Sequence, residues 1–234
     1  MYRRVIVTVA ILVLLFCCIP VSVGQLAAVP QPTIILPITI QSNDVIVLGE
    51  NRPSEYAYQN WSFEYWTESK DVFSDINGRR PFPWGGEVFE GDITFLANKE
   101  GYSGQRSFQI ESSTASSHGA IAVPDLPYKP DVESNQLYYL GCWVKYDITE
   151  GYGVRLTQQF FLPKDTFYPT YACYGKWLKG KSNGWVYLGL LVKAPKDTYK
   201  GDPVIELWGQ GTVAVDEVYF GPAEIKQGNS GGLT

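Results

Sequence analysis

The chain has 234 residues, of which 45% are apolar, 15% aromatic and 18% charged. This composition supports a globular core and excludes a disordered or collagen-like polymer. The formal net charge of −5 argues against a nucleic-acid partner, because phosphate binding requires a basic footprint.

Residues 2–24 have the pattern of an export signal. Arg3 and Arg4 precede an apolar run that ends at Ile19, and residues 22–24 form a small-x-small cleavage site. The longer run Val5–Val23, interrupted only by Thr8, Pro20 and Ser22, is also just long enough for an uncleaved membrane anchor, which would be the only membrane contact that the sequence suggests. In both cases we expect a secreted or cell-surface domain.

Residues 25–44 are apolar and rich in proline. Pro30, Pro32 and Pro37 exclude a helix there. The stretch is either a linker or an added edge strand. The second alternative is supported by Thr33–Leu36, whose apolar and β-branched side chains would promote association if they were exposed to water. We expect one β domain over residues 45–222, and a flexible tail over residues 223–234, which end in a Gly/Ser-rich stretch.

Strand signals recur along the rest of the chain, and no helical window of real length is present. Short runs rich in Val, Ile, Tyr, Phe and Trp are separated by Gly, Pro, Asn and Asp. These runs are Val45–Leu48, Arg106–Glu111, Leu137–Tyr146, Gly153–Phe161, Trp185–Val192, Pro203–Trp208 and Thr212–Phe220. The spacing predicts an all-β fold, an antiparallel β-sandwich of the jelly-roll kind.

Alternation within these runs separates two faces. In the run from Leu137, the positions of Tyr138 and Leu140 share one face, and those of Tyr139 and Trp143 share the other. One side of the strands is therefore aliphatic. The other side mixes Trp and Tyr with Arg, Gln, Lys and Glu, which is unusual for plain solvated surface, where Trp is rare.

The order of motifs resembles that of carbohydrate-binding modules of the galactose-binding, jelly-roll type, often appended to xylanases and glucanases. The matching segments, in chain order, are Asn60–Glu64 (N-x-S-F-E), Gly101–Phe108, Tyr138–Lys145 (Y-x-L-S-x-W-V-K), Gly184-Trp185, Ala194-Pro195 and Gly211–Val218 (G-T-V-x-F-D-D-V). The resemblance spans residues 60–222. It implies that pyranose rings stack on aromatic side chains while polar side chains bind the hydroxyls.

The candidate glycan-binding residues follow from this chemistry and from the strand faces. Trp143, Tyr187 and Trp208 are candidates for stacking, and Arg155, Gln159 and Glu206 for hydroxyl binding. Trp84 and Trp177 are candidate platforms on loops. The alternative for each aromatic residue is a place in the core.

The resemblance also implies a structural Ca²⁺. Its matching ligands are Glu64 and Asp216, with Ser103 through its backbone. Two carboxylates from distant strands would repel unless a cation lay between them. The alternative is a solvated pair that never meets.

Two cysteines remain once the signal segment is set aside. Cys142 and Cys173 form an even pair in an oxidising compartment, which predicts a disulfide. The alternative is two buried thiols that act as small apolar side chains.

Three function classes follow. The first is a non-catalytic domain that binds polysaccharide or glycan. The second is a structural surface, filament or envelope subunit that self-associates through residues 25–42 by adding a strand to a neighbour. The third is a small jelly-roll glycoside hydrolase, for which Glu206 is the one acid to nominate. We expect binding without catalysis.

Overall fold

The computed structural model describes residues 31–38, 44–49, 61–69, 71–165 and 167–227. Its strands are β1 (Thr33–Ile35), β2 (Asp44–Leu48), β3 (Thr67–Glu68), β4 (Arg79–Arg80), β5 (Gly85–Glu90), β6 (Ile93–Asn98), β7 (Ser107–Ser112), β8 (His118–Ala122), β9 (Leu137–Phe161), β10 (Tyr171–Tyr174), β11 (Gly180–Lys181), β12 (Val186–Lys193) and β13 (Lys200–Gln227). Within the described residues one 3₁₀ helix, η1 (Leu126–Tyr128), is the only helical element. The predicted all-β class is confirmed.

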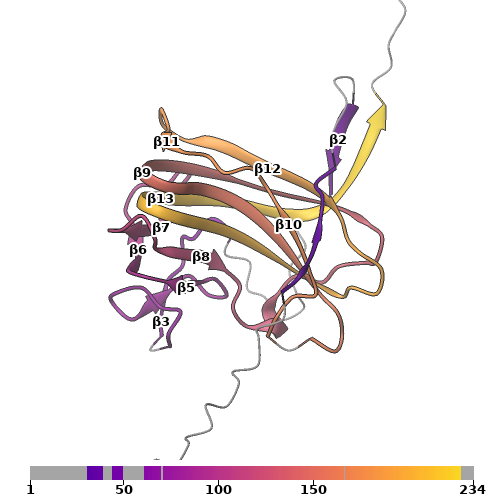
Figure 1. The fold of residues 1–234 in the computed structure, drawn as a ribbon, viewed down its shortest axis with the longest axis horizontal. Coiled ribbons are helices and arrows are strands. Elements are labelled where there is room, and N and C mark those ends of the chain that lie inside the picture. The colour runs from indigo at the N-terminus through magenta and orange to yellow at the C-terminus, as the bar shows by residue number, and fades with distance from the viewer. Residues whose placement is uncertain (1–30, 39–43, 50–60, 70, 166, 228–234) are drawn as a thin grey trace, which may run out of the picture. The chain divides into compact units, whose positions relative to one another are not determined.

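The strands β9 and β13 organise the domain. They pair antiparallel along almost their whole lengths of 25 and 28 residues. Midway, both strands pass through glycines with positive φ, from 99° at Gly151 to 144° at Gly211, and the register shifts at Gly209 and Gly211. Glycine adopts this backbone without strain. Each long strand therefore bends there and contributes one half to each of two layers (Figure 1).

The strand pairing defines the layers. The first layer contains β12, the first half of β9, the second half of β13, β7 and β6, with β2 at the end of β13. The second layer contains β10, the second half of β9, the first half of β13, β8 and β5. This is an antiparallel sandwich whose layers stay connected through the bent strands, as predicted.

The core lies between the layers, on the aliphatic faces that alternation indicated. Tyr138, Leu140 and Val144 from the first half of β9 join Val154 and Leu156 from its second half in one buried cluster. Because every second residue points inward on both sides of the bend, the intervening positions form two outer faces, one on each layer. Any ligand site made by the sheets must lie on one of these outer faces or at an edge.

The two cysteines lie in this core as free thiols, so the predicted disulfide is wrong for this structure. Cys142 is on β9 in the first layer, opposite Leu188, whereas Cys173 is on β10 in the second layer, opposite Gln158. Both are fully buried. Each thiol fills core space as a small apolar side chain, which is the alternative reading.

The segment before the domain adds a strand to its own chain. β1 pairs in parallel with β10, and the amide of Ile38 donates a hydrogen bond of 2.8 Å to Leu191 on β12. The segment therefore crosses the open edge between the two layers. At the other terminus β13 does not stop at residue 222 but continues to Gln227, because its last residues pair with β2.

The export signal over residues 1–24 lies outside the described residues. Among the residues that are described, no helix is long and apolar enough to cross a membrane.

Candidate functional site

The outer face of the second layer carries a compact group of aromatic and charged side chains, here named the Arg155 face. Arg155 on β9, Glu206 on β13 and Ala120 on β8 lie opposite one another in register, and Trp208 lies opposite His118 one step along. The face comprises Phe89, His118, Tyr152, Arg155, Thr157, Tyr174, Trp177, Glu206 and Trp208.

The carboxylate of Glu206 is the centre of this face. Its side chain is only 5% exposed. Nη2 of Arg155 donates to Oε2 at 2.9 Å and to Oε1 at 3.2 Å, Nε2 of His118 lies 2.9 Å from Oε2, and the hydroxyl of Thr157 donates to Oε1. Three side chains from three positions thus satisfy one buried anion, as a buried charge requires.

The environment of Glu206 keeps it ionised. Burial by itself would raise its pKa, but the His118 hydrogen bond, the Arg155 charge and the Arg155 and Thr157 hydrogen bonds together lower that pKa below its ordinary value. A negative charge paired with a neighbouring guanidinium leaves the centre of the face close to neutral.

Aromatic rings enclose this polar centre. The guanidinium carbon of Arg155 lies 4.0 Å from the ring centroid of Tyr174 and 4.2 Å from that of Trp177. The ring of His118 stacks on Trp208 with centroids 4.6 Å apart and 10° between the planes. Cation–π contacts and stacking of this kind hold the polar groups in fixed orientations.

The outermost rings of the face are exposed to solvent. Tyr152 is 52% exposed and Phe89 is 49% exposed, and they contact Trp208 and His118 respectively. Nε of Arg155 is buried and has no hydrogen-bond partner among the described residues. A buried donor without a partner costs free energy.

The predicted glycan-binding residues divide between different places. Arg155, Glu206, Trp177 and Trp208 come together on the Arg155 face. Gln159 lies further along the same side of β9, opposite Asp202.

Trp143 and Tyr187 are brought together elsewhere. They lie opposite each other in register on the first layer, with ring centroids 5.2 Å apart. They therefore belong to the other outer face of the sandwich.

The prediction for Trp84 is wrong. Its side chain is 1% exposed and packs edge-on against Trp61 and Phe63, with both centroid separations at 5.4 Å. Trp84 directly precedes β5, and the first two residues of that strand, Gly85 and Gly86, are buried as well. It cannot serve as a stacking platform.

Several residues of the face were not singled out from the sequence. Phe89, His118, Tyr152 and Tyr174 all contribute rings. Thr157 is two residues after Arg155 on β9, so the period-two pattern could have placed it on the same face. His118 reaches Glu206 only because β8 pairs with β13, a contact between residues 88 positions apart that local patterns do not encode.

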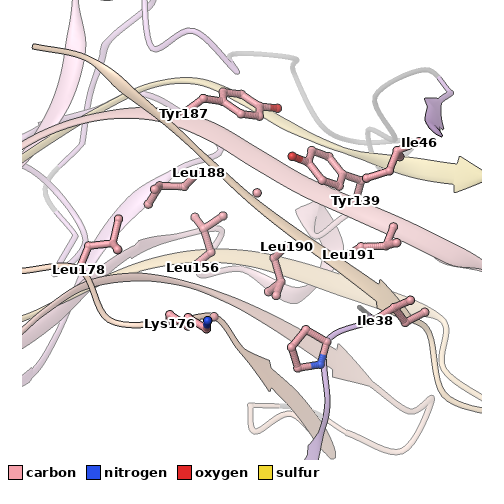
Figure 2. Close-up of a pocket in the computed structure, with 13 residues that line it drawn as sticks. Ile38, Ile46, Tyr139, Leu156, Lys176, Leu178, Tyr187, Leu188, Leu190 and Leu191 are labelled. Carbon is pink, nitrogen blue, oxygen red and sulfur yellow. The ribbon is translucent and has the colours of Figure 1, made fainter. Parts of the chain in front are cut away.

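A separate pocket of about 490 Å³ opens at the edge between the layers. Figure 2 shows leucines of β9 and β12 around it, with Ile38 of the N-terminal segment beside them. Pro37 also lines the pocket. Apart from Lys176 and the hydroxyls of Tyr139 and Tyr187, the side chains that line it are apolar. Tyr139 and Tyr187 also contribute to the outer face of the first layer, whereas the other side chains of this pocket offer a saccharide few hydrogen-bonding partners.

The predicted calcium ligands surround one turn. Oε1 of Glu64 accepts hydrogen bonds from the amides of Gln105 and Arg106, at 2.9 and 3.1 Å. Oδ2 of Asp216 accepts from the amides of Tyr102 and Ser103, at 2.7 and 3.1 Å. Glu64 and Asp216 therefore lie at the same turn as Ser103, and both carboxylates accept hydrogen bonds from backbone N–H groups of that turn.

The calcium site stays a prediction, and in this structure Glu64 and Asp216 accept hydrogen bonds from backbone amides of the turn. The amide of Ser103 faces Asp216, whereas a calcium ligand would be its carbonyl oxygen. Among the described residues no group of three or more His, Cys, Asp or Glu side chains could hold a metal ion. Burial raises the pKa of Asp216 to about 6, against the lowering effect of the hydrogen bonds from three backbone amides.

No model of a protein family matches the sequence, and no curated protein matches it either. Comparison with solved structures finds carbohydrate-binding modules, the type of protein that the sequence motifs resemble. One is TmCBM61 in complex with β-1,4-galactotriose, at 11% identity and a TM-score of 0.43, covering 74% of this chain and 99% of that chain. Another is the CBM22-1 xylan-binding domain of Xyn10C from Paenibacillus barcinonensis, at 14% identity and a TM-score of 0.40, covering 75% and 97%.

A further similar structure is the enzymatically active domain of tailspike protein 4 from bacteriophage CBA120. It has 14% identity and a TM-score of 0.44, and the match covers 60% of this chain but only 19% of the tailspike chain. All three TM-scores lie below 0.5.

Proposed function

We propose that this chain is an exported domain that binds glycans, without cleaving them, through the Arg155 face. The observation that carries the proposal is the buried Arg155–Glu206 pair enclosed by Trp177, Tyr174 and Trp208 on an outer sheet face. Aromatic faces next to fixed hydrogen-bonding groups match a pyranose ring, which has apolar C–H faces and hydroxyls at its rim.

The charge balance of the face narrows the class of ligand that it could bind. Arg155 and Glu206 neutralise each other, so the centre of the face offers no net charge to an acidic or basic partner. Uncharged saccharides are therefore the ligand class that fits best.

Catalysis by Glu206 is disfavoured by the same contacts. A glycosidase needs a protonated acid and a second carboxyl group facing it. Glu206 is held in the ionised form, which does not suit the acid, and the groups that contact its carboxylate are Arg155, His118 and Thr157 rather than a second carboxyl group. Binding without cleavage is the function that these residues support.

The test is a glycan array probed with the full chain, which includes xylohexaose and β-1,4-galactotriose. The glycan bound best is then titrated against Trp177→Ala and Tyr152→Ala. We expect each substitution to weaken binding by about 1–3 kcal/mol, the range measured for aromatic stacking on nucleic-acid bases. Phe167→Ala is the matched control, because Phe167 is 85% exposed and makes no ring contact with described residues.

Unchanged affinity in both test variants, with thermal melting intact, would remove the Arg155 face from glycan binding. Failure of the full chain to bind any glycan on the array would overturn the proposal altogether.

A second proposal is self-association through residues 25–42. It is favoured by the exposed apolar side chains on and next to β1, where Ile34 is 54% and Leu36 is 82% exposed. Within the described part of the chain β1 pairs only with β10, which leaves its other edge open to a second copy. Sedimentation velocity should then detect an oligomer that disappears when residues 25–42 are deleted, whereas a monomer at all concentrations would contradict it.

A further inference from the structure

The outer face of the first layer carries a second aromatic group, here named the Trp143 face, which comprises Tyr102, Tyr139, Trp143 and Tyr187. The ring of Tyr102 stacks on Trp143 with centroids 3.9 Å apart and 12° between the planes, and Tyr187 meets Trp143 edge-on. Tyr102 and Tyr187 are 45% and 39% exposed. These rings thus present apolar faces to solvent and are not part of the core.

Two glycines shape this face. Gly141 on β9 lies opposite Gly189 on β12. A Cβ at Gly141 would lie 2.1 Å from the hydroxyl oxygen of Tyr187, and a Cβ at Gly189 would lie 1.9 Å from that of Tyr139. The missing side chains let the two tyrosine rings lie across the sheet.

The side chains of Tyr139 and Tyr187 also interact with each other. Figure 2 shows the side chains of Tyr139 and Tyr187 with their hydroxyls turned toward one another, and a hydrogen bond joins them. Burial raises the pKa of both hydroxyls, so the rings stay neutral at physiological pH. The result is a fixed and uncharged aromatic surface.

A polar hollow of about 210 Å³ lies further along the first layer, where Lys145 of β9 is part of its lining. Lys145 follows Trp143 on the same side of β9, and Nζ of Lys145 pairs at 2.8 Å with Glu100, two residues before Tyr102. The hollow also has Asn98, Gln109, Asp147 and Lys181 in its wall, and Lys181 pairs with Asp147. Two cations and two anions cancel, which favours an uncharged ligand rich in hydroxyls.

We propose that the Trp143 face is a second saccharide-binding site, so that one domain binds two glycan segments on opposite sides of the sandwich. This inference rests on the proposed function and extends it. The Arg155 face and the Trp143 face belong to different layers with the core between them, so one short oligosaccharide cannot occupy both. A domain with two such sites would cross-link polysaccharide chains.

Calorimetric titration of the full chain tests the inference, with the oligosaccharide bound best on the array as the probe. We expect two sites per chain in the unmodified protein. The Tyr102→Ala, Tyr187→Ala double variant should keep one site, and the Tyr152→Ala, Trp177→Ala double variant should keep the other. Gly189→Ala offers an independent check, because its methyl group must displace the Tyr139 ring and should weaken binding at the Trp143 face by about tenfold or more.

The outcomes separate the two proposals. The second site is overturned if calorimetry finds one site per chain that is unaffected by the Tyr102 and Tyr187 substitutions and lost on substitution of Tyr152 and Trp177. The proposed function would still hold in that case. One site with the reverse sensitivity supports the Trp143 face and overturns the role of the Arg155 face. No binding to any array glycan overturns both proposals.

Discussion

Nη2 of Arg155 reaches both carboxylate oxygens of Glu206, at 2.9 and 3.2 Å, although the two residues are 51 positions apart in the chain. The pair lies on an outer face of the sheet and is nevertheless mostly buried, because Trp177 and Tyr174 cover the guanidinium. The stability of this face therefore depends on a charge pair that water reaches poorly.

Arg155→Ala should destabilise the protein by about 3 kcal/mol, because it leaves the Glu206 carboxylate buried without its main counter-charge. Lys181→Ala is the matched control. Its partner Asp147 and Lys181 itself are 48% and 75% exposed, so the loss should be no more than about 1 kcal/mol. Urea denaturation measures both, and equal losses would contradict the network described here.

Stability should also depend on pH through Glu206. Its pKa is below the ordinary value of 4.5 in the folded protein, so the unfolded chain binds a proton there first. The stabilisation is therefore complete above about pH 4.5 and is lost as the pH falls through the folded-state pKa. Glu206→Gln should lose less stability between pH 5 and pH 3 than the unmodified protein does.

Asp216 contributes with the opposite sign. Since its pKa is raised from 3.8 to about 6, its contribution to stability decreases as the pH rises through that interval. Both proteins retain Asp216, so the difference between them isolates Glu206. Identical pH profiles would contradict an ionised Glu206.

Period-two patterns predicted the strands and their faces well. Arg155 and Thr157 share the outer side of β9 as alternation indicated, and Leu156 is buried in the core beside them. What the pattern could not supply was the bend. The glycines near residues 151 and 209 place the two halves of β9 in different layers, which moves Trp143 and Trp208 to opposite outer faces.

The remaining wrong predictions concern contacts between segments that are distant in the sequence. Trp84 was expected to be a stacking platform on a loop, but it packs against Trp61 and Phe63 in the core. An even number of cysteines indicated a disulfide, but cysteine count carries no information on which layer each strand joins. The motif around Asp216 correctly placed this carboxylate beside the turn at Ser103.

Chelation tests the calcium that the family resemblance implies. Because Glu64 and Asp216 accept hydrogen bonds from backbone amides of the turn, we expect the melting temperature to stay constant when EDTA is added. Asp216→Ala should lower it with or without EDTA, since three amides lose their acceptor. A lower melting temperature in EDTA, restored by Ca²⁺, would instead support the metal site.

Alkylation tests the state of the cysteines. Burial raises the pKa of the Cys173 thiol to about 11 and that of Cys142 still further, so neither should react in the folded protein at neutral pH. After unfolding without reductant, iodoacetamide should label both residues, as peptide mapping would detect. A cross-linked peptide that contains Cys142 and Cys173 would contradict the free thiols.

A crystal structure of the full chain, soaked with the oligosaccharide that the array selects, tests the central claim most directly. We predict a sugar ring in contact with Tyr152 or Trp177. Saccharide bound only at other surfaces, without contact to Tyr152 or Trp177, would contradict the proposed role of the Arg155 face.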